Sequence, residues 1–207
     1  MKKFLLFLMC IPIIGCSPVI YSGIYQMNLS KVEHPAENNL RYGETKIINL
    51  GNDSLQKYSY EDDVIKITWS IYRDQLEFNL LNKTIFSLKI IWDDVAYVDH
   101  SGKSNRVIHA GIKYAQRSEP QAPTTIAKGA FIDDLILPAE NVFMTSIYSG
   151  WEKKSLVPSY APEKEILLND SKNYIGKTVK VVLPIQIEGT INEYAFTFDI
   201  TGFTPYF

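Results

Sequence analysis

The stretch IKITWSIYRDQLEFNL, residues 65–80, decides the fold of this chain. Its first seven residues place an apolar side chain at every second position, and residues 76–80 repeat the same alternation after the polar segment 72–75. A period of two is typical of a half-buried antiparallel strand, because successive side chains point to opposite faces of a sheet. Two such runs joined by four polar residues predict a β-hairpin.

Period two continues outward from this hairpin in both directions along the sequence. Further expected strands cover residues 85–92, 95–98, 105–110, 122–130, 131–137, 178–187 and 194–201. A helical pattern occurs only around residues 162–169, where Pro162 suits a first helical turn. We therefore expect an all-β fold, an antiparallel, immunoglobulin-like β-sandwich of about ten strands with at most one short helix. A single sheet closed on itself, as in lipocalins, stays open, because period two does not distinguish it from two stacked sheets.

The first seventeen residues, MKKFLLFLMCIPIIGCS, carry two lysines, an apolar run over residues 4–14 and a cysteine after a glycine. They resemble a bacterial lipoprotein export signal with its lipobox. The apolar run is shorter than the roughly 20 residues of a membrane span. The resemblance implies cleavage between Gly15 and Cys16, a diacylglyceride on the Cys16 thiol and an acylated new amine. An ordinary secretory signal with an incidental cysteine is the alternative.

The residues around Cys16 also bear on where the protein is anchored. Ser17 follows the cysteine, and in the enterobacterial lipoproteins a residue other than aspartate at this position directs sorting to the outer membrane. No acidic cluster stands beside Cys16. We expect anchoring by lipid on Cys16, at the outer membrane and facing the periplasm.

Three parts follow from this reading of the chain. We expect a removed signal peptide over residues 1–15, a lipidated N-terminus and tether over residues 16–43, and one β-sandwich domain over residues 44–207. The tether would reach roughly 30 Å if flexible. An alternative is that apolar residues within it, including Tyr21 and Tyr25, pack back onto the domain.

Charge and cysteine content exclude several function classes. Loss of residues 1–15 removes two lysines and no acid, which leaves 19 basic and 23 acidic residues and a net charge of −4. No nucleic-acid partner is expected from such a chain. Cys10 leaves with the signal and Cys16 takes the lipid, so disulfides, cysteine nucleophiles and zinc–cysteine or iron–sulfur sites are excluded. We expect no cofactor and no metal.

The candidates for catalysis are few. Asp93, Asp94, His100 and His109, with the pair Asp133–Asp134, are the polar residues that a hydrolase would have to bring together. No histidines share metal-ligand spacing, and aspartate doublets at strand ends are mostly solvated turn residues. We therefore expect no catalytic residue.

Aromatic residues near one loop are the better lead. Tyr148, Trp151 and Tyr160 flank a segment rich in lysine and proline. An exposed platform of this kind stacks on sugars or anchors a protein partner. The alternative is that Trp151 folds back onto the end of the sandwich.

Several strings, among them residues 90–94 (IIWDD), 106–109 (RVIH) and 174–177 (YIGK), resemble a group of uncharacterised exported lipoproteins of Gram-negative, Bacteroidota-like bacteria. The resemblance covers about residues 60–203. It implies a β-sandwich and carries no catalytic residues.

The sequence thus favours a non-enzymatic, membrane-anchored module of the bacterial cell envelope that binds another envelope component, protein or glycan. The alternative is a hydrolase or carbohydrate-binding protein that acts on envelope or extracellular polysaccharide.

Overall fold

A computed structural model describes residues 20–34, 45–52, 55–146, 148 and 150–206. Strands dominate it, and all the pairings between them are antiparallel. The strands are β1 (Tyr21–Glu33), β2 (Lys46–Asn49), β3 (Lys57–Glu61), β4 (Ile65–Ile71), β5 (Leu76–Asn82), β6 (Leu88–Ile90), β7 (Ala96–Val98), β8 (Ser104–Ile108), β9 (Thr124–Ile126), β10 (Phe131–Pro138), β11 (Val142–Ser146), β12 (Gly150–Lys153), β13 (Tyr160–Ala161), β14 (Thr178–Ile187) and β15 (Thr190–Tyr206). The helices are α2 (Lys164–Lys172) and the 3₁₀ turns η2 (Trp92–Asp94), η3 (Tyr114–Gln116) and η4 (Ala139–Asn141). The all-β, antiparallel prediction is confirmed.

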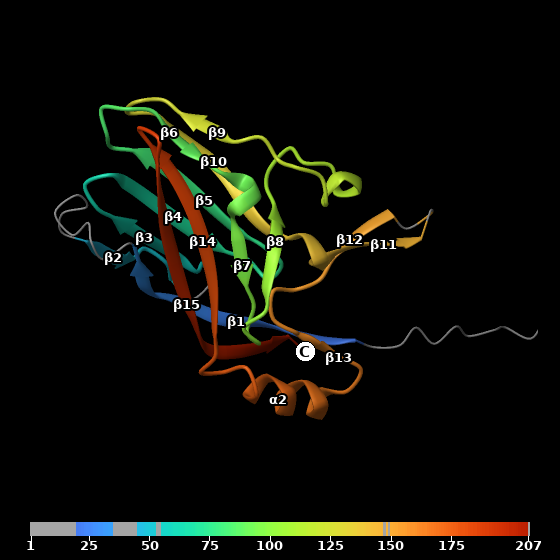
Figure 1. Ribbon diagram of the computed structural model, residues 1–207. Helices are drawn as coiled ribbons and strands as arrows, with labels where there is room; N and C mark the ends of the chain where they lie inside the picture. Colours follow the sequence, from blue (N-terminus) through green and yellow to red (C-terminus); the bar gives the residue numbers. More distant parts are fainter. Residues whose placement is uncertain (1–19, 35–44, 53–54, 147, 149, 207) are drawn as a thin grey trace, which may run out of the picture.

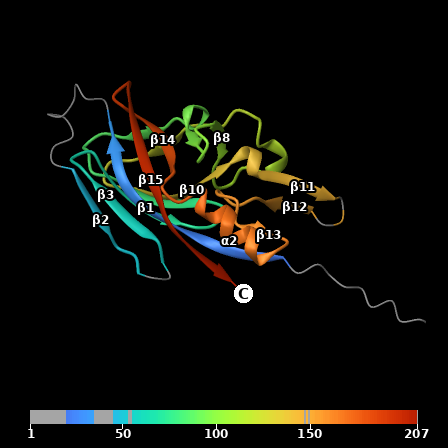
Figure 2. The ribbon, with the colours of Figure 1, turned by 90° about the horizontal axis from the view of Figure 1, so that it is seen from below.

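One long sheet makes up most of the molecule. Its strand order is β13-β1-β15-β14-β7-β8-β10-β5-β4-β3-β2; β6 also pairs with β14, β9 pairs with β6, and β11 and β12 form a separate hairpin. The sheet curls so that its two halves face each other (Figures 1 and 2). Trp69 of β4 packs across the interior against Phe196 and Phe198 of β15, with ring centroids 5.1 and 5.6 Å apart. The core therefore lies between the β3–β5 half and the β14–β15 half.

The hairpin predicted over residues 65–80 is present as β4 and β5. Ile71 pairs with Leu76 across the turn, and the alternating apolar residues of both strands are buried, from Ile65 to Ile71 and from Leu76 to Leu80. The helix expected around residues 162–169 is present as α2, which begins slightly later, at Lys164.

Residues 21–33 of the expected tether form the strand β1, so the main sheet begins before residue 44, and apolar residues of this segment pack onto the domain as the alternative stated. β1 pairs with β15 along most of its length and buries Tyr25, Met27 and Leu29. These three side chains alternate with Gln26 and Asn28, which is the same period of two as in the rest of the sheet. This alternation is short and lies near Pro18, Gly23 and Pro35, so the sequence alone did not indicate a strand here. Residues 16–19 and 35–43 of the expected tether lie outside the described residues.

Gln56 links the two halves of the curled sheet. Its side chain accepts a hydrogen bond from the Met27 backbone N–H at 2.6 Å and donates one to the Tyr25 carbonyl at 2.8 Å. Tyr58 of β3 adds a hydrogen bond to Asn28 at 2.7 Å. Side chains therefore satisfy backbone groups of β1 where no strand pairs with them.

Candidate functional site

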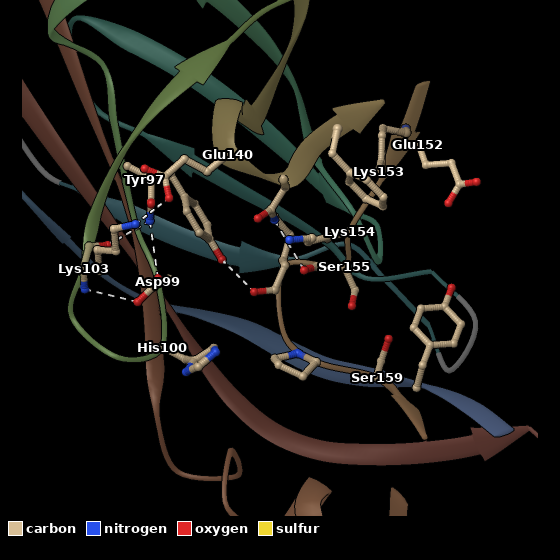
Figure 3. A pocket seen from close by; sticks show the side chains of 16 residues that line it. Tyr97, Asp99, His100, Lys103, Glu140, Glu152, Lys153, Lys154, Ser155 and Ser159 are labelled. Atoms are coloured by element: carbon tan, nitrogen blue, oxygen red, sulfur yellow. Dashed lines mark hydrogen bonds and ion pairs between the residues drawn. The ribbon is translucent and has the colours of Figure 1, made fainter. Parts of the chain in front are cut away.

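One candidate site is a surface cleft of about 610 Å³. Its walls come from the turn between β7 and β8, from η4 and the start of β11, and from residues 154–159, which we call the strap (Figure 3). The lining residues are Tyr97, Asp99, His100, Lys103, Asn105, Glu140, Asn141, Phe143, Glu152, Lys153, Lys154, Ser155, Leu156, Pro158, Ser159 and Tyr160.

The strap is held in place by the main sheet, so the cleft has a fixed wall. The Leu156 backbone N–H donates to the Arg73 carbonyl at 2.8 Å, and the Gly23 N–H donates to the Ser159 carbonyl at 3.1 Å. Leu156 and Val157 are buried in the main core. A wall anchored this way needs little ordering when a ligand binds.

Tyr97 reaches across the cleft from β7 toward the strap (Figure 3). Its hydroxyl donates to the Leu156 carbonyl at 3.5 Å. Burial, with a contribution from the Asp99 charge, raises the pKa of Tyr97 far above its ordinary value. The phenol therefore stays protonated and acts as a hydrogen-bond donor.

Asp99 organises the turn at one edge of the cleft. Its carboxylate accepts hydrogen bonds from the Ser101 N–H at 2.8 Å, the Ser101 hydroxyl at 2.6 Å and the Lys103 N–H at 3.1 Å. Burial alone would raise the pKa of Asp99, but these hydrogen bonds outweigh it and lower the pKa below the usual range. Gly102 has φ +88°, a conformation that suits glycine in this turn.

Two buried polar atoms at the cleft have no hydrogen-bond partner among the described residues: His100 Nδ1 and Ser159 Oγ. The His100 ring packs edge-on against Tyr174 at 4.8 Å. Burial lowers the pKa of His100, helped by Lys177 and opposed by Asp99, which favours the neutral imidazole. Buried polar groups normally have partners, so these two atoms are unusual among the described residues.

Three of the six charged residues that line the cleft form ion pairs. Lys103 forms an ion pair with Glu140, and Lys153 forms one with Asp74 at 2.5 Å. The Lys154 ammonium lies 5.3 Å from the centre of the Phe143 ring. The cleft thus combines balanced charges, hydrogen-bonding groups and aromatic rings, which suits a neutral polar ligand better than a free ion.

The three predicted aromatic residues do not all lie at this site. Tyr160 lines the cleft, with the Arg73 guanidinium 4.8 Å from its ring centre. Trp151 of β12 packs against Tyr114 at 6.1 Å, so it folds back onto the domain. Tyr148, 98% exposed, lies between β11 and β12.

His109 and Asp134 are the one pair of predicted catalytic candidates that the structure joins among the described residues. His109 Nδ1 lies 3.2 Å from an Asp134 carboxylate oxygen, and the imidazole stacks on Trp92 at 4.0 Å. The other Asp134 oxygen accepts the backbone N–H groups of Ala110 and Leu135, each at 2.8 Å. These contacts fix the Asp134 carboxylate between backbone and ring.

The remaining candidates are scattered. Asp93 pairs with Arg106 at 2.6 Å, Asp94 is exposed in η2, and Asp133 accepts a hydrogen bond from Asn79 at 2.9 Å. His100 lies in the cleft. No group of three or more histidine, cysteine or acidic side chains within the described residues is placed to hold a metal ion.

Most residues that line the cleft could not be identified from the sequence. Lys103, Glu140, Phe143 and Ser159 come from segments far apart in the chain and carry no motif. Only the polar composition of residues 99–103 and the prolines of the strap marked these segments as loops.

Within the described residues, no helix is long and apolar enough to cross a bilayer. Comparison with known protein families, curated proteins and solved structures found no match for this chain.

Proposed function

We propose that this protein is a lipid-anchored, non-enzymatic binding module of the bacterial cell envelope, and that the cleft bounded by the strap binds another envelope component, protein or glycan. The single observation that carries the binding role is the pre-formed cleft itself, in which a strap anchored to the main sheet stands beside polar and aromatic side chains, among them Phe143 and Tyr160. A ligand that offers hydrogen-bonding groups and an apolar face would match this lining.

The proposed location of the protein depends on the N-terminal residues, which lie outside the described part of the chain. The cationic start, the apolar run and the Gly15–Cys16 junction support lipidation of Cys16, and Ser17 supports the outer membrane, facing the periplasm. Two or three acyl chains anchor a protein far more firmly than one.

The proposed fold type is an immunoglobulin-like β-sandwich, adapted by curling of one long sheet. The packing of β4 and β5 against β15 through Trp69 supports it. Loops at the edges of such scaffolds commonly carry recognition.

A hydrolase of envelope or extracellular polysaccharide is the second candidate, and the His109–Asp134 pair favours it. A hydrolase of this kind needs a second carboxylate or a nucleophile beside the pair. Asp93 and Asp133 are engaged with Arg106 and Asn79 instead. We therefore place the binding module first.

The binding role is tested by titrating the protein with a soluble peptidoglycan disaccharide-tetrapeptide, a probe that offers both glycan and peptide chemistry. We expect saturable binding by calorimetry, weakened about tenfold (about 1.4 kcal/mol) by Phe143→Ala. Tyr148→Ala, which removes an exposed ring outside the cleft, is the matched control and should leave binding unchanged. Equal losses in both variants, or no binding, would argue against the cleft as the site.

The anchor is tested separately. Cys16→Ala should move the protein from the membrane fraction to the soluble fraction, and unchanged fractionation would contradict lipidation of Cys16.

A further inference from the structure

The position of β1 fixes how the domain meets its membrane. We infer that the face made by Ile20, Tyr160 and Tyr206, which we call the β1-start face, rests against the bilayer that holds the lipid of Cys16. This inference rests on the proposed lipidation of Cys16.

The chain between the anchor and the sheet is short. β1 begins at Tyr21, five residues after Cys16. A fully extended chain spans at most about 3.6 Å per residue, so the Cα atom of Tyr21 lies no more than about 18 Å from that of Cys16. This is well below the reach of roughly 30 Å for a flexible tether of 27 residues.

The start of β1 cannot move independently of the domain. Tyr21 pairs with Ala161, and Ser22 pairs with both Tyr160 and Tyr206. From there β1 continues along β15, whose end lies beside the start of β1 in both ribbon views (Figures 1 and 2). Holding Tyr21 near the lipid surface therefore holds the whole β1-start face there.

The exposed side chains of this face suit a lipid surface. Ile20 is 65% exposed, Tyr160 49% and Tyr206 52%. Tyrosine is enriched where membranes meet water, because its ring prefers the apolar side and its hydroxyl the wet side. The opposite end of β15, at the turn from β14, lies far from this face (Figure 1).

This orientation limits where the ligand of the cleft can be located in the envelope. Ser159 and Tyr160 line the cleft, and Tyr160 also belongs to the β1-start face. The cleft is then at the membrane end of the domain. Its ligand would be an envelope component held near the bilayer surface, rather than one that the domain meets on its far side.

Fluorescence quenching tests the orientation on the full, natively lipidated protein. Single cysteines are introduced by Tyr206→Cys or Ile20→Cys on the β1-start face and by Ile191→Cys beside the β14–β15 turn; all three native side chains are exposed. The mature chain has no other free thiol once Cys16 carries lipid, so a thiol-reactive fluorophore marks one site. The protein is reconstituted in phosphatidylethanolamine–phosphatidylglycerol vesicles that contain a lipid with a nitroxide on its headgroup.

We expect several-fold stronger quenching at positions 206 and 20 than at position 191. A ten-residue glycine–serine insertion after Ser17 should remove most of that difference, because it lengthens the link. Equal quenching at all three sites, or stronger quenching at position 191, in membrane-bound protein would overturn the orientation while leaving the anchor intact. Labelling of Cys16 itself in protein without added cysteines would instead overturn the lipid anchor, and the orientation with it.

Discussion

At the scale of single residues, Asp62 shows how burial changes the role of a turn aspartate. Its carboxylate is buried and accepts hydrogen bonds from the hydroxyls of Tyr60 and Tyr194 at 2.9 and 3.0 Å. It also accepts the backbone N–H groups of Val64 and Ile65 at 2.8 and 2.7 Å. One carboxylate thus ties the β3–β4 turn to β15 across the core.

We predict that Asp62→Ala lowers the free energy of unfolding by about 3 kcal/mol, because four buried donors lose their acceptor. Asp63→Ala, at the exposed neighbour, is the matched control and should change it by less than about 0.5 kcal/mol. Urea unfolding followed by tryptophan fluorescence measures both. Similar effects in the two variants would show that the buried network is not what holds the turn.

His100 makes stability depend on pH. Burial holds its pKa in the folded state below the ordinary value of 6.5. As pH falls below about 6.5, the unfolded chain therefore binds more protons at this residue than the folded one, and stability is lost. We predict a smaller loss of stability between about pH 7 and pH 5 in His100→Gln than in the wild type. Urea midpoints at the two pH values measure it, and parallel curves would contradict it.

At the scale of elements, β1 is the strand whose role differs most from the sequence expectation. It covers the edge of β15 and buries Tyr25, Met27 and Leu29. Burial of three such side chains contributes roughly 5–9 kcal/mol. That is comparable with the whole stability of a typical domain.

We therefore predict that a chain starting at Thr45 does not fold, while one starting at Ser17 does. The shorter chain should lack near-ultraviolet circular dichroism and a cooperative thermal transition. If it melted cooperatively at the same temperature as the longer chain, residues 17–44 would be a tether after all.

At the scale of the whole molecule, the curled sheet depends on side-chain hydrogen bonds between segments that do not pair as strands. Gln56 supplies two hydrogen bonds to β1 from the segment before β3. We predict that Gln56→Ala lowers the free energy of unfolding by about 2 kcal/mol, since the Met27 N–H and the Tyr25 carbonyl lose their partner. Gln116→Ala, at an exposed glutamine, should have little effect. Thermal unfolding distinguishes them, and equal stability of both variants would remove Gln56 from this role.

The sequence predicted some parts of the molecule well. The β4–β5 hairpin, the β14–β15 pair and α2 were predictable because their periodicity is local and spans several residues. β1 was missed because its alternation is short and lies among prolines and glycine. The cleft was missed because its residues meet only through the curl of the sheet.

By itself, the sequence determined the strand-rich, antiparallel character of the domain, since alternation of side chains is written along each strand. It also carries the residues on which the proposed lipid anchor depends. Only the tertiary structure decided that β1 belongs to the sheet, that Asp62 lies in the core, and that the strap and the β7–β8 turn form one cleft. These features depend on contacts between residues far apart in the chain, which no local pattern encodes. The same contacts set the short link between Cys16 and the sheet, and so the proposed orientation at the membrane.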